Sequence, residues 1–461
     1  MSRAAMIAAS VPAGAIPDQV VNICRRLAGR GHGAWVVGGC LRDLLRGKTP
    51  DDWDVATSAR PQQVQALFQR VIPTGIAHGT VVVREGGQSY EVTTLRTEAG
   101  YSDGRRPDSV AYVDDLELDL GRRDFTVNAI AYDPLSDRLL DPFGGLLDLE
   151  RRLLRTVGDP RARFDEDGLR VLRAARFVAT LEFELDPEVH EAIRGALARL
   201  KQVSRERIRD EWLKALSARR PSRALEVMRL TGILSVVCPA LLEQVGCGQN
   251  RYHAYDVWTH TLKCVDACPA DPIIRMAALL HDLGKPRTKA FSSQTEDYTF
   301  YGHEKLGADL AETWLSQYRF SNDERARVVH LIRHHLVCYT DAWSGAAVRR
   351  FLARVGIAHV DSLLALCRAD TLAKGLPVDD ALAALQRLRE RIDEVIQAGA
   401  ALETRDLAID GHDVMAALKC DPGPLVGRML RRLLERVVEQ PELNRRETLL
   451  AMLDGSLGEE G

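Results

Sequence analysis

Residues 34–57 read AWVVGGCLRDLLRGKTPDDWDVAT, and they indicate how the first part of the chain folds. The four apolar residues that open this stretch predict a short strand, which Gly38 and Gly39 end. A helix is expected over Cys40–Arg46 and a second strand over Asp52–Val55. Two glycines between a strand and a helix let backbone N–H groups come close to an anion. The stretch therefore predicts an α/β unit with a phosphate-binding turn.

Asp52 and Asp54 lie two positions apart, and on a strand such side chains project from the same face. Two like charges this close repel each other unless a cation lies between them. Mg²⁺ is the natural ion, because it binds one or two carboxylates together with substrate phosphates. Glu91, on an expected strand over Tyr90–Leu95, is a candidate third carboxylate, and a solvent-facing acid is the equal alternative. With Arg42 beside a triphosphate and metal ions on the aspartates, this is the order of groups needed for nucleotidyl transfer.

The chain divides into a mixed first part and a helical remainder. Thr80–Val83 and Tyr90–Leu95, separated by Gly86 and Gly87, predict a hairpin. From about residue 148 the apolar spacing is helical almost to the end. Helices are expected over Arg151–Leu154, Leu169–Ala179, Glu188–Leu200, Arg207–Leu216 and Ala224–Leu230, with breaks at 158–160, 186–187 and 220–221.

Six ordered blocks resemble the signature of the class II CCA-adding tRNA nucleotidyltransferases, which bacterial poly(A) polymerases share. The blocks are 38–43 (GGCLRD), 52–57 (DWDVAT), 91–97 (EVTTLRT), 122–129 (RRDFTVNA), 141–145 (DPFGG) and 166–170 (EDGLR). The resemblance covers about residues 30–240. It implies an α+β protein with a palm-like α/β nucleotidyltransferase head over 17–147. A helical neck and body over 148–245 would select the nucleotide and bind tRNA, and basic residues outnumber acidic ones there between 151 and 223.

The resemblance also implies roles for individual residues. Asp124 would hold the ribose hydroxyls. Asp167 and Arg170 would address the Watson–Crick edges of C and A as a protein template, whereas an i,i+3 surface ion pair is the alternative. Glu166 would position Arg170 or cap the helix. The implied catalytic residues are Asp52, Asp54 and Glu91, with Mg²⁺ on the two aspartates, and the implied nucleotide-binding residues are Gly38, Gly39, Arg42, Arg123, Asp124, Asp167, Arg170 and Arg173.

A second group of residues with metal-binding chemistry lies on expected helices farther along the chain. Imidazoles and carboxylates around an open position form a hydrolytic metal site. Their order resembles that of an HD-type phosphohydrolase domain, expected over 250–375 with a divalent transition metal, and Lys285 is a candidate phosphate contact. The ligands implied are His260, His281, Asp282 and Asp370, with His303, His334 and His335 as further candidates.

The expected function is addition of CCA, or of its terminal A, to tRNA 3′ ends from CTP and ATP. The 98–110 segment resembles the family's flexible loop for the switch from C to A. Similarity to CCA-adding enzymes with an HD domain implies a phosphatase or 2′,3′-cyclic phosphodiesterase acting on RNA ends, or a domain that only binds metal or tRNA. No motif marks the helical tail over 376–461.

Two alternatives stay open. One is a poly(A) polymerase, disfavoured because residues 78–83 (HGTVVV) stand where a basic block is expected and because residues 458–461 are acidic. The other is a tRNA-binding repair phosphohydrolase with a silent head, which the intact Asp52 and Asp54 disfavour.

Composition sets the broad class. The 461 residues are 46% hydrophobic and 28% charged with a net charge of −3, as in globular rather than disordered proteins. Nine cysteines without a CxxC pair support neither a disulfide scaffold nor a zinc ribbon, and they favour a cytoplasmic location. The Ala-rich segment 4–16 fits an extended start better than a signal peptide, and no membrane partner is expected.

Overall fold

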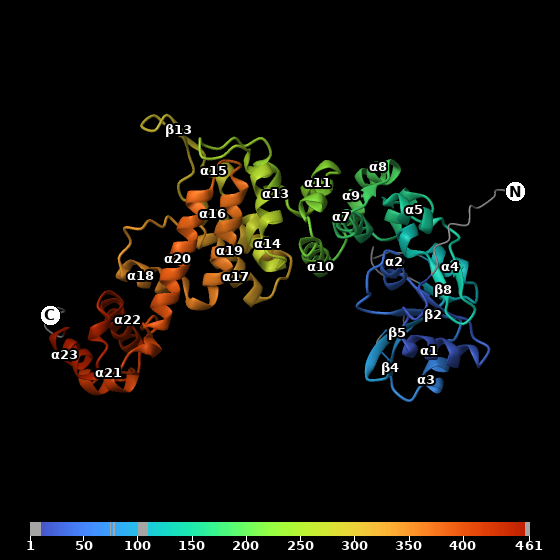
Figure 1. Ribbon diagram of the computed structural model, residues 1–461, viewed down its shortest axis with the longest axis horizontal. Coiled ribbons are helices and arrows are strands. Elements are labelled where there is room, and N and C mark those ends of the chain that lie inside the picture. Colours follow the sequence, from blue (N-terminus) through green and yellow to red (C-terminus); the bar gives the residue numbers. More distant parts are fainter. Residues whose placement is uncertain (1–10, 74, 77–78, 100–108, 457–461) are drawn as a thin grey trace. The chain divides into compact units, whose positions relative to one another are not determined.

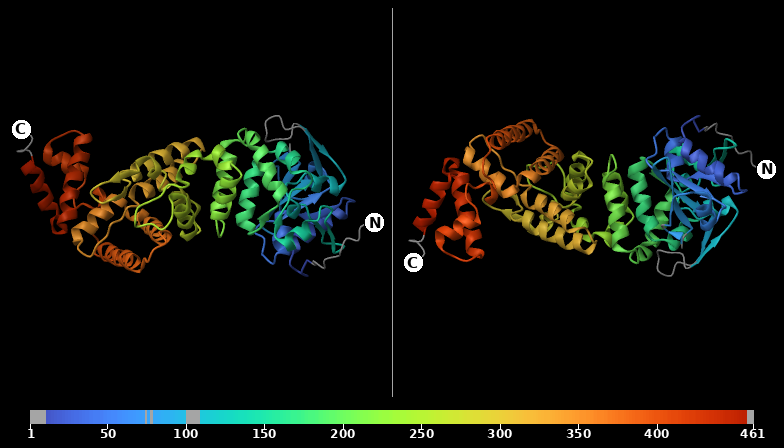
Figure 2. Two further views of the ribbon diagram at one scale, coloured as in Figure 1. Left: turned by 90° about the horizontal axis from the view of Figure 1, so that it is seen from above. Right: turned by 90° about the horizontal axis from the view of Figure 1, so that it is seen from below.

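The computed structural model describes residues 11–73, 75–76, 79–99 and 109–456. The chain falls into two compact units that divide between Pro239 and Ala240. A large sheet is confined to the first unit, whereas the second is almost entirely helical (Figures 1 and 2). This confirms the predicted α+β class. Within the described residues, no helix is both long and apolar enough to cross a membrane.

The first unit is built on a seven-stranded sheet with the strand order β3-β4-β5-β2-β1-β8-β9. β2 pairs with β5 in parallel and with β1 in antiparallel orientation. A separate two-stranded ribbon is formed by β6 and β7, and a parallel pair by β10 and β11. The strands are β1 (Ala34–Val37), β2 (Asp54–Thr57), β3 (Val71–Ile72), β4 (Thr80–Glu85), β5 (Gln88–Thr94), β6 (Arg96–Ala99), β7 (Ser109–Tyr112), β8 (Ala131–Asp133), β9 (Arg138–Leu140), β10 (Leu153–Leu154) and β11 (Glu184–Leu185).

Alternating side chains divide the central strands between two cores. Val36 of β1 and Val55 of β2 lie in one core, together with apolar residues of α1 (Asp18–Ala28) and α3 (Pro61–Leu67). Val37 and Ala56, the next residues along each strand, lie in a second core on the opposite face with residues of α4 (Leu116–Gly121). Because both faces are buried, the register of these strands is fixed: a slip of one residue would exchange the two faces.

This register determines where the carboxylates lie. Asp54 begins β2 and is paired with Val37 of β1 and with Glu91 of β5. Paired residues share a face, so the carboxylates of Asp54 and Glu91 project on the same side of the sheet. Asp52 does not lie on the strand as predicted, because β2 begins only at Asp54 and Asp52 belongs to the bend before it.

The helices of the first unit correct two further predictions. Arg151–Leu154 is not helical, because Arg152 adopts a left-handed conformation (φ 54°) that ends α5, and Leu153–Leu154 pairs with β11. Glu188–Leu200 is interrupted at Ala196. The helices are α1 (Asp18–Ala28), α2 (Gly39–Leu45), α3 (Pro61–Leu67), α4 (Leu116–Gly121), α5 (Gly145–Arg151), α6 (Pro160–Glu166), α7 (Leu169–Leu181), α8 (Pro187–Gly195), α9 (Leu197–Leu200), α10 (Arg205–Leu216), α11 (Ser222–Leu230) and α12 (Ile233–Val237), with a 3₁₀ turn η2 (Thr126–Asn128).

The second unit packs α13, α14, α16, α17 and α19 against one another, and α21, α22 and α23 enclose a separate apolar core. The pair His281-Asp282 lies in the turn that follows α14 rather than inside the predicted helix. The elements are α13 (Val257–Ala267), α14 (Pro272–Leu280), α15 (Lys285–Thr288), β12 (Ala290–Ser292), β13 (Asp297–Thr299), α16 (His303–Gln317), α17 (Asn322–His334), α18 (Gly345–Val355), α19 (Ile357–Ala373), α20 (Asp379–Gln397), α21 (Gly411–Leu418), α22 (Pro424–Glu439) and α23 (Arg446–Ser456), with 3₁₀ turns at Pro239–Gln244, Thr404–Asp406 and Pro441–Leu443.

Gly168, between α6 and α7, supplies a test of the packing that holds α7. A Cβ at this position would lie 2.6 Å from the backbone of Arg199, which is too close for any side chain. We expect Gly168→Ala to lower the free energy of unfolding by about 1–3 kcal/mol. Gly195→Ala is the matched control, because a Cβ there meets nothing within 4 Å, and it should be neutral or stabilising by up to about 1 kcal/mol. Calorimetric unfolding of the full chain measures both, and equal effects would contradict the close packing.

Candidate functional site

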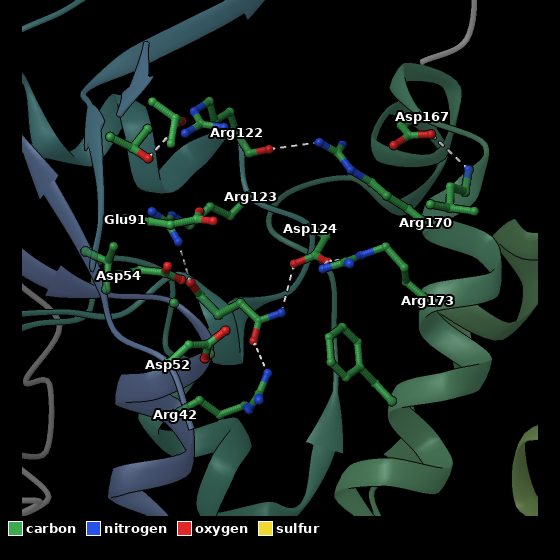
Figure 3. Close-up of a pocket in the computed structure, with 18 of the residues that line it drawn as sticks. Arg42, Asp52, Asp54, Glu91, Arg122, Arg123, Asp124, Asp167, Arg170 and Arg173 are labelled. Atoms are coloured by element: carbon green, nitrogen blue, oxygen red, sulfur yellow. Dashed lines mark hydrogen bonds and ion pairs between the residues drawn. The ribbon is translucent and has the colours of Figure 1, made fainter. Parts of the chain in front are cut away.

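A cavity of about 600 Å³ lies in the first unit, and all of the predicted catalytic and nucleotide-binding residues line it. The sheet, α2, η2, α7 and α10 contribute its walls, and Figure 3 shows how the side chains point into it. The structure thus brings together residues that are more than 130 positions apart in the sequence. They are Gly38, Gly39, Arg42, Asp52, Asp54, Glu91, Arg123, Asp124, Asp167, Arg170 and Arg173.

Three carboxylates meet at one side of the cavity. The pKa of Asp54 is raised to about 6, first by burial and then by the negative charges of Glu91 and Asp52, while Arg123 acts in the opposite direction. Repulsion of this kind indicates a site that a cation would relieve. Carboxylate oxygens are hard ligands, so the donor set fits Mg²⁺.

Arg123 is positioned beside these carboxylates by Asp119, a residue that was not predicted from the sequence. Asp119 of α4 is fully buried and contacts Arg122 at 2.8 Å and Arg123 at 3.3 Å. Its other contact is the backbone N–H of Arg96 at 3.2 Å. The spacings i,i+3 and i,i+4 are the helical signal that would have revealed both pairs.

The close approach of Arg123 explains why position 38 is glycine. A Cβ on Gly38 would lie 3.1 Å from Arg123 Nη1 and 3.4 Å from Asp54 Oδ2. Gly38 also has a φ of 80°, a conformation that other residues rarely adopt. Because Gly38 has no side chain, the Arg123 guanidinium and the Asp54 carboxylate can both approach the turn between β1 and α2.

A chain of side-chain contacts crosses the cavity from α2 to α7. Arg42 donates from Nη1 to Asn128 Oδ1 at 2.7 Å, and Asn128 donates from Nδ2 to Asp124 Oδ1 at 2.9 Å. Arg173 donates from Nε to Asp124 Oδ2 at 2.7 Å. Burial opposes the charge of Asp124, but Arg173, Asn128 and Arg170 together hold the pKa of its carboxyl well below the ordinary value. Asp124 is therefore an anion that fixes the chain of contacts.

An aromatic ring supports the arginines of this chain. The guanidinium carbons of Arg42, Arg173 and Arg176 lie 5.4, 5.3 and 4.0 Å from the centroid of the Phe177 ring. Phe177 in turn packs edge-on against Phe125 at 5.5 Å. Cation–π contacts of this kind orient guanidinium groups without using their hydrogen-bond donors. Phe177 was not among the predicted site residues.

Asp167 and Arg170 do not form the i,i+3 ion pair that was the alternative prediction. Arg207 of α10 donates two hydrogen bonds, of 3.2 and 2.6 Å, to the carboxylate of Asp167. Arg170 instead contacts the Glu166 carboxylate and donates to the carbonyls of Arg163 and Arg122, both at 3.0 Å. The contact between Glu166 and Arg170 confirms one of the two predictions for Glu166. Arg207, forty residues after Asp167, carried no signal in the sequence.

In the second unit, three helices (α13, α16 and α19) and the segments that follow α14 and α17 contribute to a buried cluster of imidazoles and carboxylates. His260 Nε2 lies 2.9 Å from Asp370 Oδ1, and His281 Nε2 lies 3.1 Å from Asp282 Oδ2. His303 Nε2 is 3.5 Å from Asp282 Oδ1. Two sets have ligand atoms within 4.8 Å of one another: His260, His281 and Asp370, and His281, Asp282 and His335.

The imidazoles are oriented like metal ligands. His281, His303 and His335 each place Nδ1 2.7 Å from a backbone carbonyl three residues earlier, which leaves Nε2 to face the cluster. Burial lowers the pKa of His335 to about 3, so this imidazole stays neutral. Within the described residues, His260 Nε2, His281 Nε2 and both oxygens of Asp282 are buried without a hydrogen bond of acceptable geometry. Such a donor set fits a divalent transition metal.

Two further sequence predictions, one in each unit, have different outcomes. His334 lies outside the cluster, because it stacks on His330 at 4.5 Å, one helical turn earlier, whereas His335 faces the cluster. The predicted loop over 98–110 falls mostly outside the described residues, as does His78. A cavity of about 370 Å³ opens beside the cluster and is lined in part by Lys285 and Lys374.

Asp54→Asn should stabilise the metal-free protein above about pH 6. The folded-state pKa of about 6 exceeds the ordinary 3.8, so the native state binds more protons than the unfolded state between these values. The free energy of unfolding therefore falls as the pH rises through this window, and Asn removes a loss of up to about 3 kcal/mol. Unfolding in EDTA should show the gain at about pH 7.5 but not at about pH 4.

Asp114→Asn serves as the control, since the Asp114 side chain is 80% exposed and its replacement should change stability by less than about 0.5 kcal/mol. A gain for Asp54→Asn that did not depend on pH would contradict the proposed repulsion.

Comparisons with known proteins assign the chain to a family. Three family models match it: "Poly A polymerase head domain" over 34–155, "Probable RNA and SrmB- binding site of polymerase A" over 182–244, and "tRNA nucleotidyltransferase domain 2 putative" over 300–453. The CCA-adding enzyme of Streptococcus suis is 32% identical over 452 residues, which are 96% of this chain and 98% of that protein. The enzyme of Lactiplantibacillus plantarum is 33% identical over 435 residues, 93% of each chain.

A solved structure agrees with these relatives. The crystal structure of the Bacillus stearothermophilus CCA-adding enzyme in complex with CTP is 30% identical, with a TM-score of 0.70. The match covers 95% of this chain and 97% of that one. The similarity therefore includes the cavity of the first unit as well as the helical second unit. The chain belongs to the class II family of CCA-adding enzymes, which are nucleotidyltransferases.

Proposed function

We propose that the first unit adds CCA, or its terminal A, to tRNA 3′ ends from CTP and ATP without a nucleic-acid template. One observation carries this proposal: a single cavity holds three carboxylates, several arginines, and a separately anchored Asp167 and Arg170. The similar Bacillus enzyme was solved with CTP, which supports a nucleoside triphosphate as the ligand.

Asp52 and Asp54, with Glu91 beside them, would hold Mg²⁺ in this cavity. Bound there as two ions, Mg²⁺ supplies charge neutralisation on the phosphates and favours the deprotonated form of the attacking hydroxyl. The backbone at Gly38 and Gly39 and the guanidinium groups of Arg122 and Arg123 bind the triphosphate. Because Asp119 fixes both arginines, their donors are oriented before the nucleotide arrives.

The Asp124 carboxylate, which was predicted to hold the ribose hydroxyls, already accepts several hydrogen bonds from protein groups. The donors are the N–H of Phe125, Asn128 and Arg173. A ribose hydroxyl that reaches Asp124 must therefore displace one of these donors or bind through Asn128 or Arg173. We infer that Asp124 acts mainly by positioning these two side chains around the sugar.

Asp167 and Arg170 supply the base selection. A carboxylate accepts from the exocyclic amino group of C or A, and a guanidinium donates to the adjacent ring nitrogen. U and G present a carbonyl and a protonated ring nitrogen at these positions, so both contacts would be lost. Arg207 holds Asp167, and Glu166 and two carbonyls hold Arg170, so the acceptor and the donor are each anchored before a base binds.

We further infer that the second unit hydrolyses phosphate from RNA 3′ ends, as an HD-type phosphohydrolase. The supporting observation is the buried set of His260, His281, Asp282 and Asp370 with polar atoms that lack good hydrogen bonds. A metal held there would supply an activated water. His303 and His335 are the other imidazoles of this cluster, and both line the adjacent cavity together with Lys285. Metal or tRNA binding without hydrolysis is the alternative outcome.

Reciprocal variants separate the two proposed activities. Asp52→Ala should lower incorporation of C and A at least about 100-fold while hydrolysis of an RNA 3′-phosphate continues, because only the first cavity loses its ion. His281→Ala should abolish hydrolysis and spare nucleotide addition. Incorporation is measured on tRNAs that end before C, after C and after CC, which also distinguishes full CCA addition from A-only addition. Loss of both activities in either variant would contradict independent sites.

Asp167→Ala should reduce base selectivity more than turnover. Loss of the acceptor for the amino group should cost about 5- to 100-fold in the preference of CTP and ATP over UTP and GTP. Arg207→Ala should show a smaller loss in the same direction, because it frees Asp167 without removing it. Arg209→Ala on the same helix is the matched control, since Arg209 pairs with Asp210 instead. Unchanged selectivity in Asp167→Ala would contradict a protein template.

A further inference from the structure

Four exposed aromatic side chains lie in the second unit, and one of them lines its cavity. Tyr301 is 85% exposed and lines this cavity. Tyr252, Phe291 and Tyr298 are 65%, 64% and 41% exposed. Among the described residues, Tyr112 in the first unit is the one other large aromatic side chain that is exposed. The concentration of four such rings between residues 252 and 301 calls for an explanation, because exposed aromatic clusters mark binding surfaces.

Two of the rings lie on a hairpin that projects from the helices of the second unit (Figure 1). Phe291 of β12 and Tyr298 of β13 are directly paired, and their ring centroids are 5.7 Å apart. Lys289 places its Nζ 4.0 Å from the centroid of the Tyr298 ring. The hairpin therefore presents two apolar faces with a cation beside them.

The hairpin is tied to the rim of the cavity. Arg251 donates from its backbone N and from Nε to Asp297 Oδ2 at 3.0 and 2.9 Å, and from Nη2 to the Thr295 carbonyl at 2.6 Å. Tyr252 follows Arg251 directly, and His253 after it lines the cavity. Arg251 thus links the hairpin to the segment that reaches the cavity, and we call Tyr252, Phe291, Tyr298 and Tyr301 the aromatic ledge.

The chemistry of this surface suits a single nucleic-acid strand. Bases stack on exposed aromatic rings irrespective of sequence, and lysine ammonium groups bind the phosphates between them. Lys289 lies at the ledge, and Lys285 and Lys374 line the cavity where the ledge ends. Lys285 already pairs with Asp282 at 2.8 Å. An apolar protein segment would use the rings but offer no anion to Lys289 and Lys374, so a polyanion with flat apolar groups matches the surface better.

We propose that the aromatic ledge binds the last nucleotides of a single-stranded RNA by stacking and delivers its 3′-phosphate to the histidine–aspartate cluster. This inference rests on the proposed hydrolase function of the same cluster. Hydrolysis adds water across the bond between phosphorus and O3′: the water oxygen bonds to phosphorus, O3′ takes a proton, and inorganic phosphate leaves. The ledge makes no contact with the reacting bond and acts through the neighbouring bases.

The test compares two substrates of the full-length protein. One is an RNA pentamer that ends in a 3′-phosphate, and the other is glycerol 2-phosphate, which has no aromatic group to stack. In the double variant Phe291→Ala/Tyr298→Ala, the ratio of kcat/KM for RNA to kcat/KM for glycerol 2-phosphate should fall about tenfold or more. Tyr298→Phe should keep the wild-type ratio, because it retains the ring. Ile396→Ala, an exposed apolar residue on α20, is the matched control and should also keep it.

A second measurement does not depend on hydrolysis. The same pentamer with 4-thiouridine next to its 3′ end is crosslinked to the metal-free protein in EDTA, and the crosslinked peptide is identified. We expect crosslinks within residues 290–305 in the wild type and their loss in the double variant.

The outcomes separate the ledge from the hydrolase. If the wild type hydrolyses neither substrate, the hydrolase function fails, and the crosslink alone decides whether RNA binds the ledge. If the wild type hydrolyses both substrates and the double variant keeps the wild-type ratio of kcat/KM values, the proposed RNA binding by the aromatic ledge is overturned. An equal fall of kcat/KM for both substrates would also overturn the proposal, because it would show that Phe291 and Tyr298 stabilise the histidine–aspartate cluster rather than bind the RNA.

Discussion

Repulsion among Asp52, Asp54 and Glu91 is the constraint on which the first cavity depends. Burial and the proximity of three carboxylates together disfavour the charge of Asp54 in a site without a cation, and both raise its pKa. Arg123 offsets part of this repulsion, and it can do so only because Gly38 leaves room for it. The ion pair with Asp119 keeps Arg123 in this position. The site is therefore poised to take up cations and the phosphates that accompany them.

Both clusters fix their functional groups through partners outside the reacting centre, but by different means. In the first unit the partners are side chains from distant elements, such as Arg207 for Asp167 and Asn128 for Asp124. In the second unit three of the imidazoles, those of His281, His303 and His335, are each held by a backbone carbonyl three residues earlier. A local backbone contact survives substitution of neighbouring side chains, whereas a network of side chains transmits each change across the cavity.

The parts of this structure that were predictable from sequence depend on local chemistry. The Gly38-Gly39 turn and the hairpin at Gly86-Gly87 were predicted because they need only neighbouring residues. Arg207 and Asn128 were missed because their roles depend on contacts made across the fold. His334 was included because adjacent helical residues are indistinguishable without the rotation of the helix, which places His335 toward the cluster and its neighbour on His330.

The ligand chemistry of the two clusters would let one chain support the two proposed metal-dependent reactions. Oxygen-only ligands at Asp52 and Asp54 favour Mg²⁺, whereas imidazole nitrogens at His260 and His281 favour a transition metal. Each site can therefore fill without competing for the ion of the other. The proposed reactions are also chemically ordered, because nucleotidyl transfer needs a free 3′-hydroxyl and phosphate hydrolysis produces one. An RNA end blocked by phosphate would have to visit the histidine–aspartate cluster first, and only its product is a substrate for the carboxylate site.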